Sequence, residues 1–241
     1  MLERFSKSYK LSNKEKFVEK LINFSVDQDY FILLNSNNNS DKYDLLCGYG
    51  IKSFIKSSEN SLTKLDNFFE LKKDWLFGYM TYDLRNEIEV LNDDNIDFIN
   101  MPNLYFFQPE IVWFVKGKIV TALSFEKDLI DNDWKKFNEI SEKEKTENSN
   151  IIKLNLRNSK SDYINKVNKI KERIFRGDCY EMNFCFDLFS EYDEINPYDT
   201  YVKLNNYTKS PMSSFLKVND LFLISSSPER FLSKNGEDII S

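Results

Sequence analysis

The side chains with the clearest potential for chemistry lie near the end of the sequence, in the run SSSPERF from Ser225 to Phe231. There Glu229 and Arg230 stand side by side behind the rigid Pro228, soon after the apolar stretch LFLIS. Burial at the end of an apolar strand raises the pKa of a carboxyl group, as a proton donor working near neutral pH requires. The same two residues could instead form a solvated turn pair, because most charged pairs at turns only face water.

A second set of polar side chains alternates with apolar ones between Tyr180 and Leu188. Glu181, Asn183 and Asp187 fall on one face of the segment, and the apolar residues fall on the other. This period of two predicts a strand. Its polar face either lines a cavity or is exposed to water.

The composition narrows the chemistry that is available. The 241 residues include no histidine, so Ser–His and Cys–His nucleophile pairs are excluded and acid–base work falls to Glu, Asp, Lys or Tyr. The 3 cysteines have no CxxC spacing, which argues against a disulfide framework and a zinc site. A net charge of −6 disfavours nucleic acid or an anionic membrane as the main partner. The N-terminus lacks a signal-peptide pattern and no apolar run is long enough to cross a membrane, so we expect a cytoplasmic protein.

Short apolar runs with turn signals predict a mixed α+β domain over residues 1–140. The runs cover Tyr30–Leu34, Tyr43–Cys47, Leu76–Tyr82 and Ile111–Ala122, and Lys116-Gly117 predicts a hairpin within the last of them. A helix is expected from about Asp133. The segment 141–158, which contains SEKEKTENSN, is interpreted as a linker because its centre has no apolar residue.

Residues 159–241 form a second predicted domain, which contains the candidate chemistry. Ser161 is expected to cap a helix with apolar residues at spacings of three and four, and Gly177 to end it. Asn196-Pro197 predicts the start of a further helix. Two apolar strands around Asn219-Asp220 predict a tight hairpin.

Three blocks in this half resemble, in order, the chorismate-utilising enzymes, and within them component I of aminodeoxychorismate synthase and its sibling, component I of anthranilate synthase. GDCYEMN (Gly177–Asn183) is similar to the GD-x-Y-x-x-N element of that family, and KSPMSSF (Lys209–Phe215) and SSSPERF to its next two blocks. Upstream, FILLNSN, WLFGYMTYDLRNEIE and MPNLYFFQP resemble its N-terminal domain. The resemblance implies an α+β fold of two packed antiparallel sheets with helices outside, here truncated before the C-terminal part of the fold.

The resemblance also implies where the chemistry lies. In this family, chorismate and Mg²⁺ bind in a cleft supplied largely by the C-terminal half. Glu229 matches a general acid near the leaving hydroxyl group, and Asn183 and Arg230 match the wall of the substrate site. A PIKGT or PIAGT element and the glutamates that hold Mg²⁺ follow the SSSPERF block in the family. We therefore expect them beyond Ser241 and expect no metal ligand in this chain.

The N-terminal domain of the family often holds a tryptophan. By resemblance, Ser36, Pro211 and Met212 match elements that contact it. Asn35 stands where the family has an acidic residue before that serine, which weakens the expectation that the amino group of tryptophan is recognised here.

Together these features predict an incomplete portion of component I of aminodeoxychorismate synthase, in folate and para-aminobenzoate biosynthesis. The family reaction aminates chorismate with ammonia from a glutamine amidotransferase subunit, so chorismate and that subunit are the expected partners. We expect the chain alone to be inactive. Component I of anthranilate synthase and a non-catalytic binding fragment are the alternatives, and the residue in the PI-x-GT element that would separate the two enzymes is absent from the sequence.

Overall fold

The computed structural model of the chain describes residues 3–40, 42–89, 91, 96–140, 152–191 and 195–240. It divides into two compact units, Met1–Lys143 with Pro197–Ser241, and Glu144–Asn196. This division differs from the predicted domains, because residues from Pro197 onward belong with the N-terminal part of the chain. The cause is the pairing of two strands that are far apart in sequence, described next.

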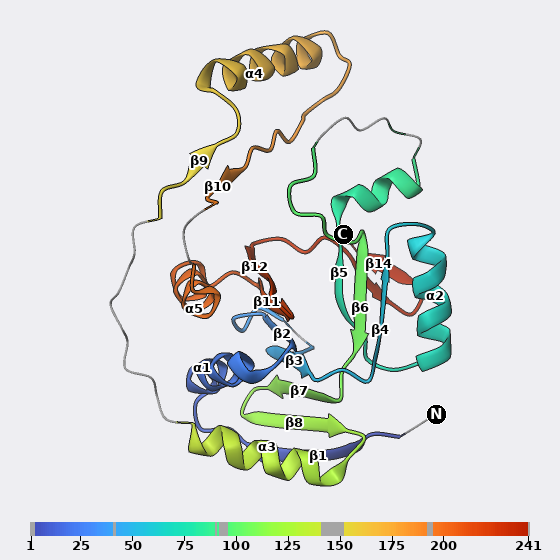
Figure 1. Cartoon of the computed structure of the whole chain (residues 1–241), viewed down its shortest axis with the longest axis vertical. Coiled ribbons are helices and arrows are strands. Elements are labelled where there is room, and N and C mark those ends of the chain that lie inside the picture. The colour runs from blue at the N-terminus through green and yellow to red at the C-terminus, as the bar shows by residue number, and fades with distance from the viewer. Residues whose placement is uncertain are drawn as a thin grey trace. The chain divides into compact units, whose positions relative to one another are not determined.

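A seven-stranded antiparallel sheet forms the centre of the first unit (Figure 1). Its strand order is β1-β8-β7-β3-β2-β11-β12. Strand β11 lies against β2, with Ser213 opposite Asn35 and Val218 opposite Tyr30, and it joins the C-terminal residues to the N-terminal sheet. The strands are β1 (Phe5–Lys10), β2 (Tyr30–Asn35), β3 (Leu45–Tyr49), β7 (Ile111–Lys116), β8 (Ile119–Ser124), β11 (Met212–Val218) and β12 (Leu221–Ser227).

A three-stranded antiparallel sheet, in the order β4-β6-β5, packs against the large sheet. Phe77, Tyr105 and Phe107 from the small sheet share a buried cluster with Ile32 and Leu216 of the large one. Helix α2 lies along the other side of the small sheet (Figure 1). These elements are β4 (Ser53–Ser57), α2 (Ser61–Lys72), β5 (Phe77–Met80) and β6 (Leu104–Gln108), with a short 3-10 helix η2 at Tyr82–Glu87.

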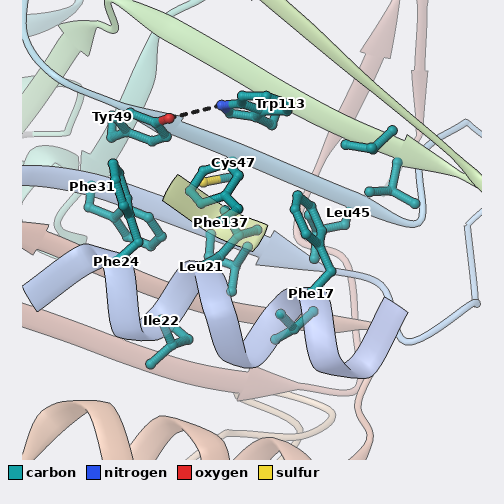
Figure 2. Packing of buried hydrophobic residues seen from close by; sticks show 14 of the residues in the cluster. Phe17, Leu21, Ile22, Phe24, Phe31, Leu45, Cys47, Tyr49, Trp113 and Phe137 are labelled. Carbon is teal, nitrogen blue, oxygen red and sulfur yellow. Dashed lines mark hydrogen bonds between the residues drawn. The ribbon is translucent and has the colours of Figure 1, made fainter. Parts of the chain in front are cut away.

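Three helices cover the other face of the large sheet: α1 (Lys14–Phe24), α3 (Lys127–Glu139) and α5 (Pro197–Thr208). Phe17 and Leu21 of α1 point into a cluster with Cys47 of β3 and Phe137 of α3, as Figure 2 shows. A 3-10 helix η1 at Ser25–Asp27 follows α1, and a hairpin of β13 (Ser233–Asn235) and β14 (Asp238–Ile240) ends the unit. The fold is therefore α+β with two packed antiparallel sheets and helices outside, as the family resemblance implied.

One polar network is enclosed in the helix-covered core. Trp113 donates from Nε1 to the Tyr49 hydroxyl (3.0 Å; Figure 2), and Tyr49 donates to Asp133 Oδ2 (2.7 Å). Lys136 donates to the other carboxylate oxygen of Asp133 (3.0 Å). Burial and the neighbouring Asp133 raise the pKa of Tyr49. Because each of these polar groups has a partner, the network fixes the position of α3 on the sheet.

Glycine is required where the strands of the small sheet meet. A β-carbon at Gly78 would lie 1.8 Å from the carbonyl oxygen of Tyr105 on the adjacent strand. Gly48 has a similar role between the sheets, since its β-carbon would lie 2.8 Å from the Phe77 ring. The absence of side chains at these positions permits the close packing of β5 with β6 and of Phe77 with the large sheet.

The two sheets are also joined by a buried ion pair. The Arg4 and Asp74 side chains are 6% and 14% exposed and approach to 2.7 Å. Arg4 also donates to the carbonyl oxygens of Pro109 (2.7 Å) and Glu110 (3.0 Å), and Gln108 donates to Asp74 (2.7 Å). Burial raises the pKa of Asp74, but the hydrogen bonds from Arg4 and Gln108 outweigh it, and the pKa lies below its ordinary value.

This lowered pKa predicts an acid-sensitive contribution to stability. A carboxyl group whose pKa is lower in the folded state stabilises the fold above its unfolded pKa of about 3.9 and loses that contribution as the pH falls through the folded value. We expect the urea midpoint of the wild type to fall more steeply below about pH 4 than that of Asp74→Asn. Parallel pH profiles for the two proteins would contradict this assignment.

Lys217 of β11 is a buried lysine, 8% exposed, that pairs with no carboxylate among the described residues. It donates to the carbonyl oxygens of Val26 (2.8 Å) and Ser25 (3.3 Å) at the end of α1, and lies over the Tyr198 and Phe222 rings.

Lys217→Met leaves the two carbonyl groups without this donor. We expect the free energy of unfolding to fall by about 1–3 kcal/mol in urea titrations, whereas the exposed Lys203→Met on α5 should leave it unchanged. An Lys217→Met protein as stable as the wild type would contradict the role.

In its described residues the second unit contains one long helix, α4 (Lys160–Phe175), and two strands of two residues each, β9 (Asn155–Leu156) and β10 (Leu188–Phe189). The helix begins two residues earlier than predicted, because Ser159 and not Ser161 accepts the capping hydrogen bond, from the Asp162 amide (3.1 Å). Gly177, with φ of 81°, follows the helix end as expected. The predicted linker centre, 141–150, lies outside the described residues.

The predicted strand Tyr180–Leu188 is wrong apart from its last residue. Among the described residues of this unit, only Leu188 and Phe189 pair with another strand, opposite Leu156 and Asn155. The alternating segment before them has no partner strand within the described part of the chain, and Tyr180 is 93% exposed. A period of two gives a strand only when the backbone finds a partner, and here it does not.

Candidate functional site

Glu229 and Arg230 follow the last strand of the large sheet. Strands β11 and β12 form the predicted hairpin around Asn219-Asp220, and SSSPERF begins in the last residues of β12. The Ser227 hydroxyl donates to the Glu229 carbonyl oxygen (2.9 Å), and the Glu229 amide donates back to that hydroxyl (3.2 Å). These two bonds fix the backbone at Glu229 in a tight turn.

The carboxyl group of Glu229 is exposed, as is the side chain of Arg230. The burial that the sequence suggested for Glu229 is absent, because β12 is an edge strand and is only half-buried. Phe231, directly after the pair, is 92% exposed. The turn therefore presents a carboxyl group, a guanidinium group and an aromatic ring to solvent.

Asn183 lies in the second unit, in a segment without helix or strand, and its side chain is exposed. The Tyr163 ring of α4 packs against the rings of Phe184 and Phe186, which follow Asn183 in the chain. The distances between ring centroids are 5.4 Å and 5.6 Å, and these contacts hold the segment near the helix. Asp187 pairs with Arg157. Glu229 therefore lies in the first unit and Asn183 in the second. Each residue is described within its own unit.

Ser36, Pro211 and Met212, the residues matched to a tryptophan site, are brought to one end of the large sheet. Pairing of Ser213 with Asn35 places Met212 at the register position next to Ser36. The Ser36 hydroxyl donates to the Asp44 carbonyl oxygen (3.1 Å) and is buried, so it stabilises the turn that follows β2. Pro211 and Met212 are half-buried. Ser36 is far from Pro211 and Met212 in sequence, and the pairing of β2 with β11 brings them together.

A cavity of about 310 Å³ lies close to this end of the sheet and was not predicted. It is lined by α1, α5 and the residues after β2. None of its polar side chains belongs to a motif that we interpreted as catalytic. The sequence signal for the cavity was that Asn35 and Lys209 lie close in sequence to Ser36 and Pro211, which were matched to a tryptophan site.

The described residues contain no group of three or more His, Cys, Asp or Glu side chains that could hold a metal ion. Among the helices in the described part of the chain, none has both the length and the apolarity needed to cross a membrane.

The sequence matches the protein family described as chorismate binding enzyme over residues 20–241. The match includes the small sheet, every strand of the large sheet except β1, and the SSSPERF turn. The chain belongs to the chorismate binding enzyme family.

Its curated relatives include enzymes named aminodeoxychorismate synthase component 1. Those from Escherichia coli (strain K12), Salmonella typhimurium (strain LT2) and Klebsiella aerogenes are 27%, 30% and 30% identical over 81, 79 and 83 residues. These stretches cover 34%, 32% and 34% of this chain and 18%, 17% and 18% of the relatives. Among solved structures, MenF, the menaquinone-specific isochorismate synthase from Escherichia coli, aligns over 95% of this chain and 51% of its own, with 11% identity and a TM-score of 0.47.

Proposed function

We propose that this chain is a portion of component I of aminodeoxychorismate synthase, which aminates chorismate to 4-amino-4-deoxychorismate. The observation that supports the proposal most is that three curated relatives bear that enzyme's name, within a family match that extends over residues 20–241. Ammonia comes from a glutamine amidotransferase subunit in this proposal, and Mg²⁺ is the cofactor, with ligands outside the described residues.

In this proposal Glu229 acts as the general acid. Hydroxide is a poor leaving group, and a carboxylic acid placed beside the departing hydroxyl group of chorismate can donate a proton as the carbon–oxygen bond breaks. The nitrogen of ammonia forms the new bond to the ring, and the hydroxyl group leaves as water. Arg230 and Asn183 are proposed to line the site, where the guanidinium group suits a carboxylate of chorismate.

The identity of the product tests the proposal. A component I protein that contains this chain, with and without an amidotransferase subunit, is incubated with chorismate, ammonium and Mg²⁺, and products are separated by mass spectrometry. An active component I that contains this chain should yield 4-amino-4-deoxychorismate, which keeps the enolpyruvyl group. Anthranilate with released pyruvate would instead establish the anthranilate synthase alternative.

The 241 residues alone are expected to give no product, because the PI-x-GT element and the Mg²⁺-binding glutamates of the family are not among them. Turnover by the chain alone would contradict that part of the proposal. Chorismate binding without turnover by any form that contains the chain would support the non-catalytic alternative.

A further inference from the structure

We propose that Ser227 is a positioning residue, whose hydroxyl group holds Glu229 in the orientation that proton donation requires. The inference rests on the proposed function, in which Glu229 is the general acid. Ser227 is the last residue of β12 and is half-buried, whereas Glu229 is exposed. A fixed hydroxyl group therefore stands directly before the turn that carries the acid.

This one hydroxyl group closes the turn around Pro228. It donates its proton to the Glu229 carbonyl oxygen (2.9 Å) and accepts from the Glu229 amide (3.2 Å). A serine hydroxyl group has one proton and two lone pairs, so it can make both bonds at the same time. Among the described residues, no other hydrogen bond reaches the backbone of residues 228–232. The orientation of Glu229 relative to the sheet therefore depends on the Ser227 side chain.

Few bonds rotate freely between Ser227 and Glu229. The ring of Pro228 fixes φ at that residue, so the ψ angles of Ser227 and Pro228 and the φ angle of Glu229 set the direction in which the acid leaves the backbone. The two hydrogen bonds of the hydroxyl group restrain these rotations. Without them the acid would sample other directions, and a displacement of about 1 Å can lower a rate by about 10²-fold.

The strand that carries Ser227 is itself anchored, although β12 is an edge strand. Ser227 is paired with β11, and the hydroxyl group of Ser226 is hydrogen-bonded to that of Thr208 at the end of α5. Thr208 donates its own proton to the Leu204 carbonyl oxygen (2.9 Å), so Ser226 is the donor in the bond between the two hydroxyl groups. The end of β12 is thus fixed to the sheet and to α5, and Ser227 links Glu229 to both.

Hydrogen exchange of the Glu229 amide tests this link without any substrate. The 241-residue chain is compared with its Ser227→Ala and Ser227→Thr variants. The intrinsic exchange rate of an amide depends on its own residue and the preceding one, here Glu229 and Pro228, and both are kept. The Glu229 amide should therefore exchange about fivefold faster in Ser227→Ala, the effect of one lost hydrogen bond. Ser227→Thr keeps the hydroxyl group and should match the wild type.

Kinetics in an active component I that contains this chain test the consequence for the reaction. Ser227→Ala should lower kcat for chorismate amination by about tenfold or more, with KM nearly unchanged because substrate binding does not use the orientation of the acid. Ser227→Thr should recover most of the rate. Ser8→Ala is the matched control, because Ser8 lies on the opposite edge strand, β1, and its hydroxyl group is hydrogen-bonded to that of Thr121 (2.8 Å). Its kcat should equal that of the wild type.

A double variant shows whether Ser227 acts through Glu229. Ser227→Ala should cause no further loss of kcat in a Glu229→Gln enzyme, because no acid is left to position. Additive losses would overturn the proposal, since Ser227 would then act on the reactants by itself. Unchanged exchange at the Glu229 amide in Ser227→Ala, or a Ser227→Thr enzyme as slow as Ser227→Ala, would also overturn it. Failure of the proposed function would look different: no form of the enzyme would yield 4-amino-4-deoxychorismate, and the exchange rates would still decide whether Ser227 holds the turn.

Discussion

Glu229→Gln, in an active component I that contains this chain, is expected to lower kcat for chorismate amination by about 10²–10⁴-fold, the contribution typical of a general acid. The substitution keeps the shape of the side chain and removes its proton. The backbone is expected to stay in place, because its two hydrogen bonds to Ser227 involve only main-chain atoms of Glu229. KM should change little, since the proton is transferred only as the hydroxyl group leaves.

The measurement is the rate of product formation at saturating chorismate and ammonium. Glu237→Gln is the matched control, because Glu237 is an exposed glutamate in the turn between β13 and β14. It should retain the wild-type kcat. Near-normal turnover by Glu229→Gln would show that another group donates the proton.

Arg4→Met is expected to lower the free energy of unfolding by about 3–5 kcal/mol, the cost typical of removing one partner from a buried ion pair. The methionine keeps most of the apolar part of the side chain, so the loss reports mainly on the charge. Asp74 would remain 14% exposed with its main cationic partner gone. The carbonyl groups of Pro109 and Glu110 would lose a donor as well.

Lys7→Met, in strand β1 directly after Arg4, provides the control. Lys7 also pairs with an aspartate, Asp131, but their side chains are 45% and 38% exposed. Exposed pairs contribute about 0–1 kcal/mol, so this variant should be nearly as stable as the wild type. Urea titrations of both variants measure the loss in the free energy of unfolding. Equal losses would show that burial does not determine how much the Arg4–Asp74 pair contributes to stability.

The elements that the sequence predicted well are those set by local chemistry. The turn at Gly117, with φ of 58°, and the one at Asn219, with φ of 52°, both have left-handed backbones that suit their residues. Pro197 begins α5, and Gly177 follows the end of α4. Each of these signals depends on one or two residues and their immediate neighbours, so no distant contact was needed to find them.

Long-range pairing was beyond sequence reasoning. Nothing in the order of the apolar runs indicates that β11 pairs with β2, and this contact places Pro197 onward in the first unit. The segment Tyr180–Leu188 shows the converse, a clear alternation without a partner strand. Strand identity depends on hydrogen bonds to another part of the chain, and periodicity does not specify that part.

The candidate site also combines features that local motifs predict with features that depend on long-range pairing. The resemblance selected Glu229, Arg230, Asn183, Ser36, Pro211 and Met212 by motif. The pairing of β2 with β11 then brings Ser36, Pro211 and Met212 together. The cavity beside α1 was not predicted, because its walls come from three elements that are far apart in sequence.

Isotopically labelled ammonia tests the central claim most directly. An active component I that contains this chain is given chorismate, labelled ammonium and Mg²⁺, and the products are examined by mass spectrometry and assayed for pyruvate. The proposed function predicts that the label enters a product that keeps its enolpyruvyl group, 4-amino-4-deoxychorismate, with no pyruvate released. Labelled anthranilate with pyruvate, or an unlabelled isomer of chorismate, would contradict it.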